Sequence, residues 1–208
     1  MRKSYHVVLV ITVLIYTVSS LGQKIMAQTP GPRPAPSLPV ITPKGDTTHT
    51  LSKHFITSSN LPKAPDAKGF IQRWLVLEPV HKNIARNNII TDNFLRTNFE
   101  QDNFSNDYTF IPKNGAITKI GEQELKWHGL DSKAFNFNLY HFTYALEKQK
   151  YGILVWLVTV INCDEEVKNV RMTAGCNSGS MWWLNGEEVM ILSGDRDMIV
   201  DNVTSSRI

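Results

Sequence analysis

The stretch Tyr151-Gly-Ile-Leu-Val-Trp-Leu-Val-Thr-Val-Ile161 opens the part of the sequence that decides the fold class, which ends at Leu192. This run is almost wholly apolar and rich in β-branched side chains, which is typical of a buried central strand, and it is too short for a convincing buried helix. After a polar break, Val170, Met172 and Ala174 alternate with polar residues. That alternation predicts a second strand with one buried face.

The same stretch ends in a predicted β-hairpin. Met181-Trp-Trp-Leu184 and Glu187-Glu-Val-Met-Ile-Leu192 flank the dipeptide Asn185-Gly186. Asn-Gly between two apolar runs is the strongest short-range hairpin signal, because a type I′ turn needs positive φ at both central residues. Strands separated by three polar breaks predict a mainly β domain with antiparallel sheets.

The N-terminus of the 208-residue chain has the pattern of an export signal. Arg2 and Lys3 precede a short apolar run that is followed by small residues, which predicts a signal peptide over residues 1–28. An uncleaved membrane anchor is the alternative, and the run falls short of the ~20 apolar residues of a spanning helix. We therefore expect an exported protein, periplasmic or extracellular.

The remaining chain divides into a linker and a domain. Residues 29–68 are predicted to be a proline-rich disordered linker, because proline alternates with small residues from Thr29 to Pro39. The folded domain is expected to span residues 69–208. A polar segment stands near its end where a further strand would be expected, so we expect a C-terminally truncated module of a longer protein.

Weaker patterns predict the other elements of this domain. Thr91 or Asp92 is expected to cap a short helix that carries Leu95 and Phe99. The remaining elements expected are a first strand over residues 70–77, a short strand over 108–111, a hairpin of 117–120 with 125–127, and strands over 135–144 with a bulge near Leu139.

Charge and cysteine content argue against nucleic-acid binding, membrane binding and a disulfide. The sequence has 22 basic and 19 acidic residues, and three of the basic residues lie in the predicted signal peptide. The mature chain is then formally neutral, which gives no electrostatic reason to bind nucleic acid or, after signal cleavage, a membrane. A disulfide between Cys163 and Cys176 is disfavoured, because the strand between them would separate the thiols by roughly 25–30 Å.

The sequence carries no recognisable catalytic motif. Gly175-Cys-Asn-Ser-Gly179 is close to the G-x-S-x-G nucleophile elbow of α/β-hydrolases, but Cys176 replaces its first glycine and no helix is expected to follow. We therefore expect a loop here and no cofactor. Asp195-Arg-Asp197 is read as a solvated turn, with a structural calcium site as the alternative.

The candidate ligand-binding residues lie in and after the hairpin. Trp182 and Trp183 are consecutive in a strand, so their side chains are expected on opposite faces. One tryptophan would enter the core and the other would lie exposed, suited to stack on the apolar face of a sugar whose hydroxyls bind Asn185, Asp195 and Arg196. Packing of the exposed tryptophan against a neighbouring domain is the alternative.

Two segments carry a family resemblance. Trp74-Leu-Val-Leu-Glu-Pro79 resembles the entry strand of galactose-binding-like β-sandwich modules, and Gly179-Ser-Met-Trp-Trp-Leu-Asn-Gly-Glu-Glu188 resembles their signature hairpin. Together with the proline-rich entry and Leu192-Ser-Gly-Asp-Arg-Asp197, they make residues 29–208 similar to the non-catalytic N-terminal region of secreted acetylxylan-esterase-type proteins of Bacteroidota. The resemblance implies an antiparallel β-sandwich of the jelly-roll type.

The resemblance also implies a function. We expect an exported, non-catalytic accessory module of a polysaccharide-acting protein, which binds plant cell-wall polysaccharide weakly or supports an attached catalytic domain. Two alternatives stay open. The chain is the N-terminal part of a carbohydrate esterase whose catalytic residues lie beyond Ile208, or it is a structural interaction module without a ligand.

Overall fold

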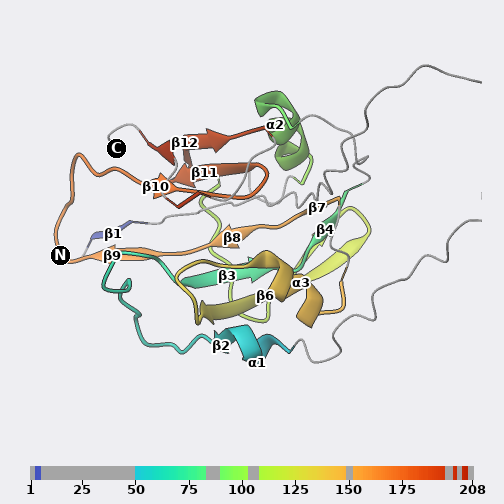
Figure 1. Cartoon of the computed structure of the whole chain (residues 1–208), viewed down its shortest axis with the longest axis horizontal. Helices are drawn as coiled ribbons and strands as arrows, with labels where there is room; N and C mark the ends of the chain where they lie inside the picture. Colours follow the sequence, from blue (N-terminus) through green and yellow to red (C-terminus); the bar gives the residue numbers. More distant parts are fainter. Residues whose placement is uncertain are drawn as a thin grey trace, which may run out of the picture.

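The computed structural model shows a mainly β protein with antiparallel strand pairs and a few short helices (Figure 1). This confirms the fold class predicted from the sequence at the level of a mainly β, antiparallel protein. The residues described are 3–5 (backbone only), 50–82, 90–102, 108–148, 152–194, 199–200 and 203–205. The candidate residues Asp195 and Arg196 lie outside them.

The largest sheet has the strand order β2-β6-β3-β8, with β5 beside β6. Its strands are β2 (Phe55–Thr57), β3 (Arg73–Leu77), β5 (Ile117–Ile120), β6 (Gln123–Ser132) and β8 (Leu157–Val158). Two-stranded sheets pair β1 (Lys3–Tyr5) with β9 (Ile161–Cys163), β4 (Val80–His81) with β7 (Ile153–Leu154), β10 (Thr173–Ala174) with β13 (Val203–Thr204), and β11 (Ser180–Leu184) with β12 (Glu187–Leu192). The helices are α1 (Leu51–His54), α2 (Asp92–Glu100) and α3 (Leu139–Ala145).

The predicted hairpins are present. Strands β11 and β12 pair around Asn185 and Gly186, whose φ values are 52° and 88°. These positive values are the geometry that favours Asn-Gly in the turn. Strands β5 and β6 form the second hairpin, and the Thr91 side chain caps α2 by accepting a hydrogen bond from the Phe94 amide at 3.1 Å.

The long apolar run does not form one strand. It is divided into β7, β8 and β9, and β7 pairs with β4 whereas β8 pairs with β3. Val155 and Trp156, between β7 and β8, are buried in two different clusters of apolar side chains. Residues 153–158 of the run are all buried, which accounts for their apolar character, and the division into short strands accompanies the change of partner from β4 to β3. The strand predicted around Val170 is reduced to β10, and Val170 itself is 41% exposed.

The strands predicted over residues 135–144 are wrong, because residues 139–145 form the helix α3. The Asn138 side chain accepts hydrogen bonds from the amides of Tyr140 (3.0 Å) and His141 (3.3 Å), which stabilises the first turn of the helix. Leu139 and Phe142, three residues apart, are both buried on one helix face. Residues 108–111 likewise form no strand.

The predicted start of the folded domain at Gly69 is too late. Helix α1 and strand β2 precede it, and β2 pairs with β6 of the largest sheet. Phe55 of β2 is 3% exposed and stacks on Phe137 with a centroid separation of 4.6 Å. Part of the segment expected to be a linker therefore belongs to the folded domain.

Apolar side chains form two separate buried clusters, to which β3 contributes in alternation. Trp74 and Val76 lie in the first cluster, and Leu77 lies in the second. The first cluster also holds Phe55, Leu130, Leu139, Phe142, Ile153, Val155, Leu157, Ala174, Cys176, Trp182, Met190 and Leu192. The second also holds Val80, Ile90, Leu95, Phe99, Ile120, Leu125, Trp127, Leu154, Trp156, Val158, Met181 and Trp183.

A charged pair is buried at the edge of the second cluster. The Lys82 ammonium contacts the Asp102 carboxylate, whose other oxygen accepts a 2.7 Å hydrogen bond from the Trp156 indole. Burial raises the pKa of Asp102 above its ordinary value, while the hydrogen bonds from Lys82 and Trp156 oppose that rise. The two bonds provide the partners that a buried carboxylate requires.

Candidate functional site

The hairpin tryptophans do not form an exposed platform. Trp182 is 6% exposed and Trp183 is 4% exposed, so the expectation that one of them faces solvent is wrong. Their opposite orientation is confirmed, since Trp182 lies in the first apolar cluster and Trp183 in the second. Both faces of β11 are covered, which sequence alternation cannot reveal. Asn185 is exposed at the hairpin turn.

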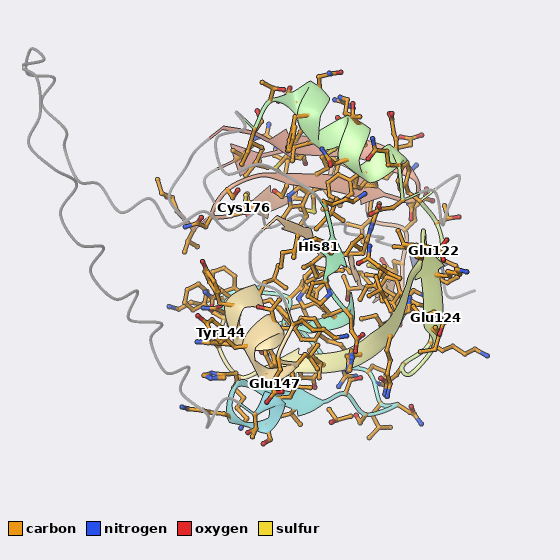
Figure 2. The ribbon with its side chains drawn as sticks, turned by 90° about the vertical axis from the view of Figure 1, so that its right-hand side faces the viewer. His81, Glu122, Glu124, Tyr144, Glu147 and Cys176 are labelled. Atoms are coloured by element: carbon orange, nitrogen blue, oxygen red, sulfur yellow. The ribbon has the colours of Figure 1, made fainter. Side chains whose placement is uncertain are left out.

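The loop of residues 175–179 lies between β10 and β11, as predicted. Cys176 is buried, its thiol accepts a hydrogen bond from the Ser180 hydroxyl at 3.2 Å, and its position beside the hairpin is seen in Figure 2. Ser178 is 2% exposed and has a φ of 73°. Gly179 is required here, because a Cβ at this position would stand 2.9 Å from methyl groups of Ile90 and Leu95. Gly179 therefore lies against Ile90 and against Leu95 of α2, and both Cys176 and Ser178 are buried, whereas Asn177 is exposed.

An open groove of about 640 Å³ lies elsewhere, on the sheet. One wall is the segment of residues 58–65, which we call the strap, and the opposite side is formed by β3, β8 and β9 with the chain between them. Apolar side chains of β3 and β8 lie beside polar ones from the strap and from β9. The lining residues are Ser58, Asn60, Leu61, Pro62, Lys63, Ala64, Pro65, Ile71, Gln72, Arg73, Trp74, Leu75, Pro112, Asn114, Val158, Thr159, Val160, Ile161 and Asn162.

The strap is held to the sheet at three points. The Ser58 amide donates to the Gly129 carbonyl at 2.9 Å, the Arg73 guanidinium donates to the Leu61 carbonyl, and the Lys63 ammonium lies 3.6 Å from the Asp131 carboxylate. Gly129 permits the close approach, because a Cβ there would meet the Ser58 hydroxyl at 2.4 Å. The groove therefore has a fixed wall, as expected for a preformed binding site.

An ion pair organises the charged end of the groove. Arg73 donates from Nε and one terminal nitrogen to the two Asp131 oxygens, at 2.7 and 2.8 Å. These bonds lower the pKa of Asp131 and raise the pKa of Arg73, so both groups stay charged at neutral pH. Asp131 is 7% exposed and does not line the groove. Lys63 and Arg73 are the charged side chains among the lining residues.

A second hollow, of about 590 Å³, lies beside β2 and shares Asn114 with the groove. Its lining includes His128, whose Nε2 lies 3.2 Å from a Glu78 oxygen. Lys148 lies 3.5 Å from the other oxygen of Glu78. His128 is thus already engaged with a carboxylate, and the groove over β3 is the better candidate for a ligand.

The sequence did not point to this groove. The strap falls in the segment that was expected to be a linker, and its contacts join residues far apart in the chain. Gly129, in the middle of β6, is the one signal that sequence reasoning passed over, because glycine inside a strand often marks a close backbone approach.

The chain matches no protein-family model, no curated protein and no solved structure. The structure thus shows a mainly β protein with an open groove on its largest sheet. In the part of the chain that the structure describes, no helix combines the length and the apolar character needed to cross a membrane.

Proposed function

We propose that the chain is a non-catalytic binding module of an exported, acetylxylan-esterase-like protein, and that it binds plant cell-wall polysaccharide in the groove beside the strap. The observation that carries this proposal is the groove itself, an open hollow with a fixed wall. It is open to solvent, as a polymeric ligand requires, and we propose it in place of the tryptophan hairpin as the contact surface.

The chemistry of the groove suits a sugar chain. Leu75 and Val160, both half-buried, offer apolar surface for the C–H faces of a sugar, whereas Asn60, Asn114 and Asn162 offer amide groups for its hydroxyls. This combination of apolar surface with a few polar groups is typical of small-molecule sites. Because no aromatic plate is exposed at the hairpin, we expect weak binding.

We further propose that the domain is a galactose-binding-like β-sandwich of the jelly-roll type. Two features support this finer assignment. Side chains of β3 lie in both apolar clusters, and so do the tryptophans of the β11–β12 hairpin. Export by a cleaved signal peptide over residues 1–28, and ligand contacts by Asn185, Asp195 and Arg196, remain predictions from the sequence.

The proposal is tested by filling the groove. Ala64, on the strap, is exposed and lines the groove, so Ala64→Trp places a large side chain in the binding space. Ala134→Trp is the matched control, because Ala134 is also exposed but lies outside the groove. Affinity electrophoresis on xylan, acetylated xylan and a galactan is expected to show retardation of the parent and of Ala134→Trp, and its loss in Ala64→Trp. Equal mobility of all three proteins on every polymer would refute the proposal.

An attached catalytic domain is the second candidate partner. Ile56 on the edge strand β2 is 55% exposed, and Leu61 on the strap is 73% exposed. Large apolar side chains exposed on neighbouring elements are typical of a surface that another domain covers. Docking of a neighbouring domain over β2 and the strap would cover both. Ile56 lies outside the groove, so Ile56→Ser is expected to weaken this docking, measured as faster limited proteolysis at β2 in the full-length protein, without changing polysaccharide binding.

A further inference from the structure

The charged end of the groove carries an inference that rests on the proposed function and deepens it. We infer that the groove selects acidic sugar chains, and that Lys63 with Arg73 forms a subsite for a carboxylate, such as that of a uronic acid side group.

Charge balance at this end of the groove supports the inference. Two cations, Lys63 and Arg73, face one carboxylate, Asp131, so one positive charge is left over. No acidic side chain is among the described residues that line the groove. A carboxylate entering from solvent therefore meets a net positive charge, and the neighbouring Asp131 carboxylate is paired with Arg73.

The geometry assigns different tasks to the two cations. Arg73 makes a bidentate pair with Asp131 and also donates to the Leu61 carbonyl, so its donors are largely committed. Lys63 lies 3.6 Å from a single Asp131 oxygen, beyond an ordinary hydrogen bond, and its side chain is 28% exposed. An ammonium has three donors, so Lys63 can bind a ligand carboxylate without leaving Asp131.

The position of Lys63 is fixed although its side chain reaches solvent. Before Lys63, the strap is bonded to the sheet through the Ser58 amide and the Leu61 carbonyl, and after it the Asp66 amide donates to the Phe70 carbonyl at 3.1 Å. A preorganised cation loses less conformational freedom on binding than a free surface lysine, so a charge-assisted bond here contributes to affinity.

The experiment compares one polymer in two charge states. Isothermal titration of the full chain with glucuronoxylan, and with the same polymer after its carboxyl groups have been reduced to alcohols, isolates the carboxylate. We expect the reduced polymer to bind about tenfold more weakly, which corresponds to one charge-assisted hydrogen bond. We expect Lys63→Gln to remove this preference, and Lys63→Arg to retain it.

Lys119→Gln is the matched control, because Lys119 is exposed on β5 outside the groove. It lowers the net charge as Lys63→Gln does and is expected to keep the preference. Equal binding of the two polymers by the parent protein would overturn the inference and leave the proposed function standing. Equal losses in Lys63→Gln and Lys119→Gln would also overturn it, since the effect would then be one of net charge. Binding of neither polymer would overturn the proposed function, and the inference with it.

Discussion

Trp182 and Trp183 are neighbours in one strand, yet their side chains are buried in two different apolar clusters. The Trp182 indole donates a 2.8 Å hydrogen bond to the Ser180 hydroxyl, and the Trp183 ring stacks on Tyr108 with a centroid separation of 4.4 Å. The register of β11 against β12 shifts between the two residues. The hairpin thus joins both halves of the interior, and its tryptophans are structural.

Truncation of either tryptophan should therefore destabilise the protein. We expect Trp182→Ala and Trp183→Ala each to lower the free energy of unfolding by about 3–5 kcal/mol, because each would leave a large cavity. Chemical denaturation followed by circular dichroism measures this change. Ile117→Ala is the control, since Ile117 is 61% exposed, and it should change stability by no more than about 0.5 kcal/mol. A tryptophan variant as stable as this control would show that its ring is not packed.

The Asp131–Arg73 pair should make stability depend on acid pH. The pKa of Asp131 is lowered in the folded state, chiefly by the hydrogen bonds from Arg73, from an ordinary value of 3.8. Its stabilising contribution is therefore complete above about pH 4 and is lost as pH falls through the lower folded value. Asp131→Asn is expected to lower the free energy of unfolding by about 1–3 kcal/mol at pH 7. It is also expected to reduce the loss of stability that the parent protein shows at acid pH.

The control for this titration is Glu124→Gln. Glu124 is exposed on the β5–β6 hairpin and lies at the outer edge of the molecule with Glu122 (Figure 2). Its substitution should leave the loss of stability at acid pH unchanged. If Asp131→Asn also left this loss unchanged, other carboxylates would be the cause of the pH dependence.

The buried Lys82–Asp102 pair should respond to substitution in a different way. We expect Lys82→Met to cost about 3–5 kcal/mol at pH 7, because it leaves the Asp102 carboxylate without its cation. Since burial raises the pKa of Asp102 in the folded state, the folded protein binds the proton more tightly, and stability falls as pH rises from 3.8 through the raised value. This fall should be steeper in Lys82→Met.

A variant that lacks both charges distinguishes the effect of the ion pair from the effect of side-chain packing. The double variant Lys82→Met with Asp102→Asn keeps an acceptor for the Trp156 indole and should recover most of the stability lost in Lys82→Met. Thermal denaturation over a pH series measures both effects. A double variant no more stable than the single one would locate the loss in the packing of the Lys82 stem.

The folded domain should need the residues before Gly69. A chain that begins at Gly69 lacks Phe55 and all of β2, so the Leu130 end of β6 loses a neighbour and the first apolar cluster loses a ring. We expect residues 50–208 to give a cooperative thermal transition, and residues 69–208 to melt at lower temperature or to expose apolar surface that binds a fluorescent dye. Equal melting temperatures would place the boundary where the sequence suggested it.

Local signals in the sequence predicted local structure well. The Asn185-Gly186 turn and the Thr91 cap depend on neighbouring residues, and both were predicted correctly. The helix α3 was not predicted, because Phe137, Leu139 and Phe142 also fit a strand pattern with a bulge, although Asn138 caps the helix. An apolar alternation alone cannot decide between these two structures.

The candidate site could not be predicted, for a physical reason. Arg73 and Asp131 are brought together by the pairing of β3 with β6, and the strap is held by contacts with those two residues and with Gly129. Burial of both hairpin tryptophans similarly depends on side chains from distant strands. Contacts of this kind arise from the topology, which a single sequence does not display.

The pairing of β3 with β8 also sets the order of events in folding. Leu75 finds its partner Val158 only after more than half of the domain has been synthesised, and the intervening chain must close a long loop first. Domains dominated by such distant pairings fold in roughly milliseconds to seconds, slower than helical bundles. The groove, which includes Leu75 and Val158, therefore forms only once β8 has paired with β3.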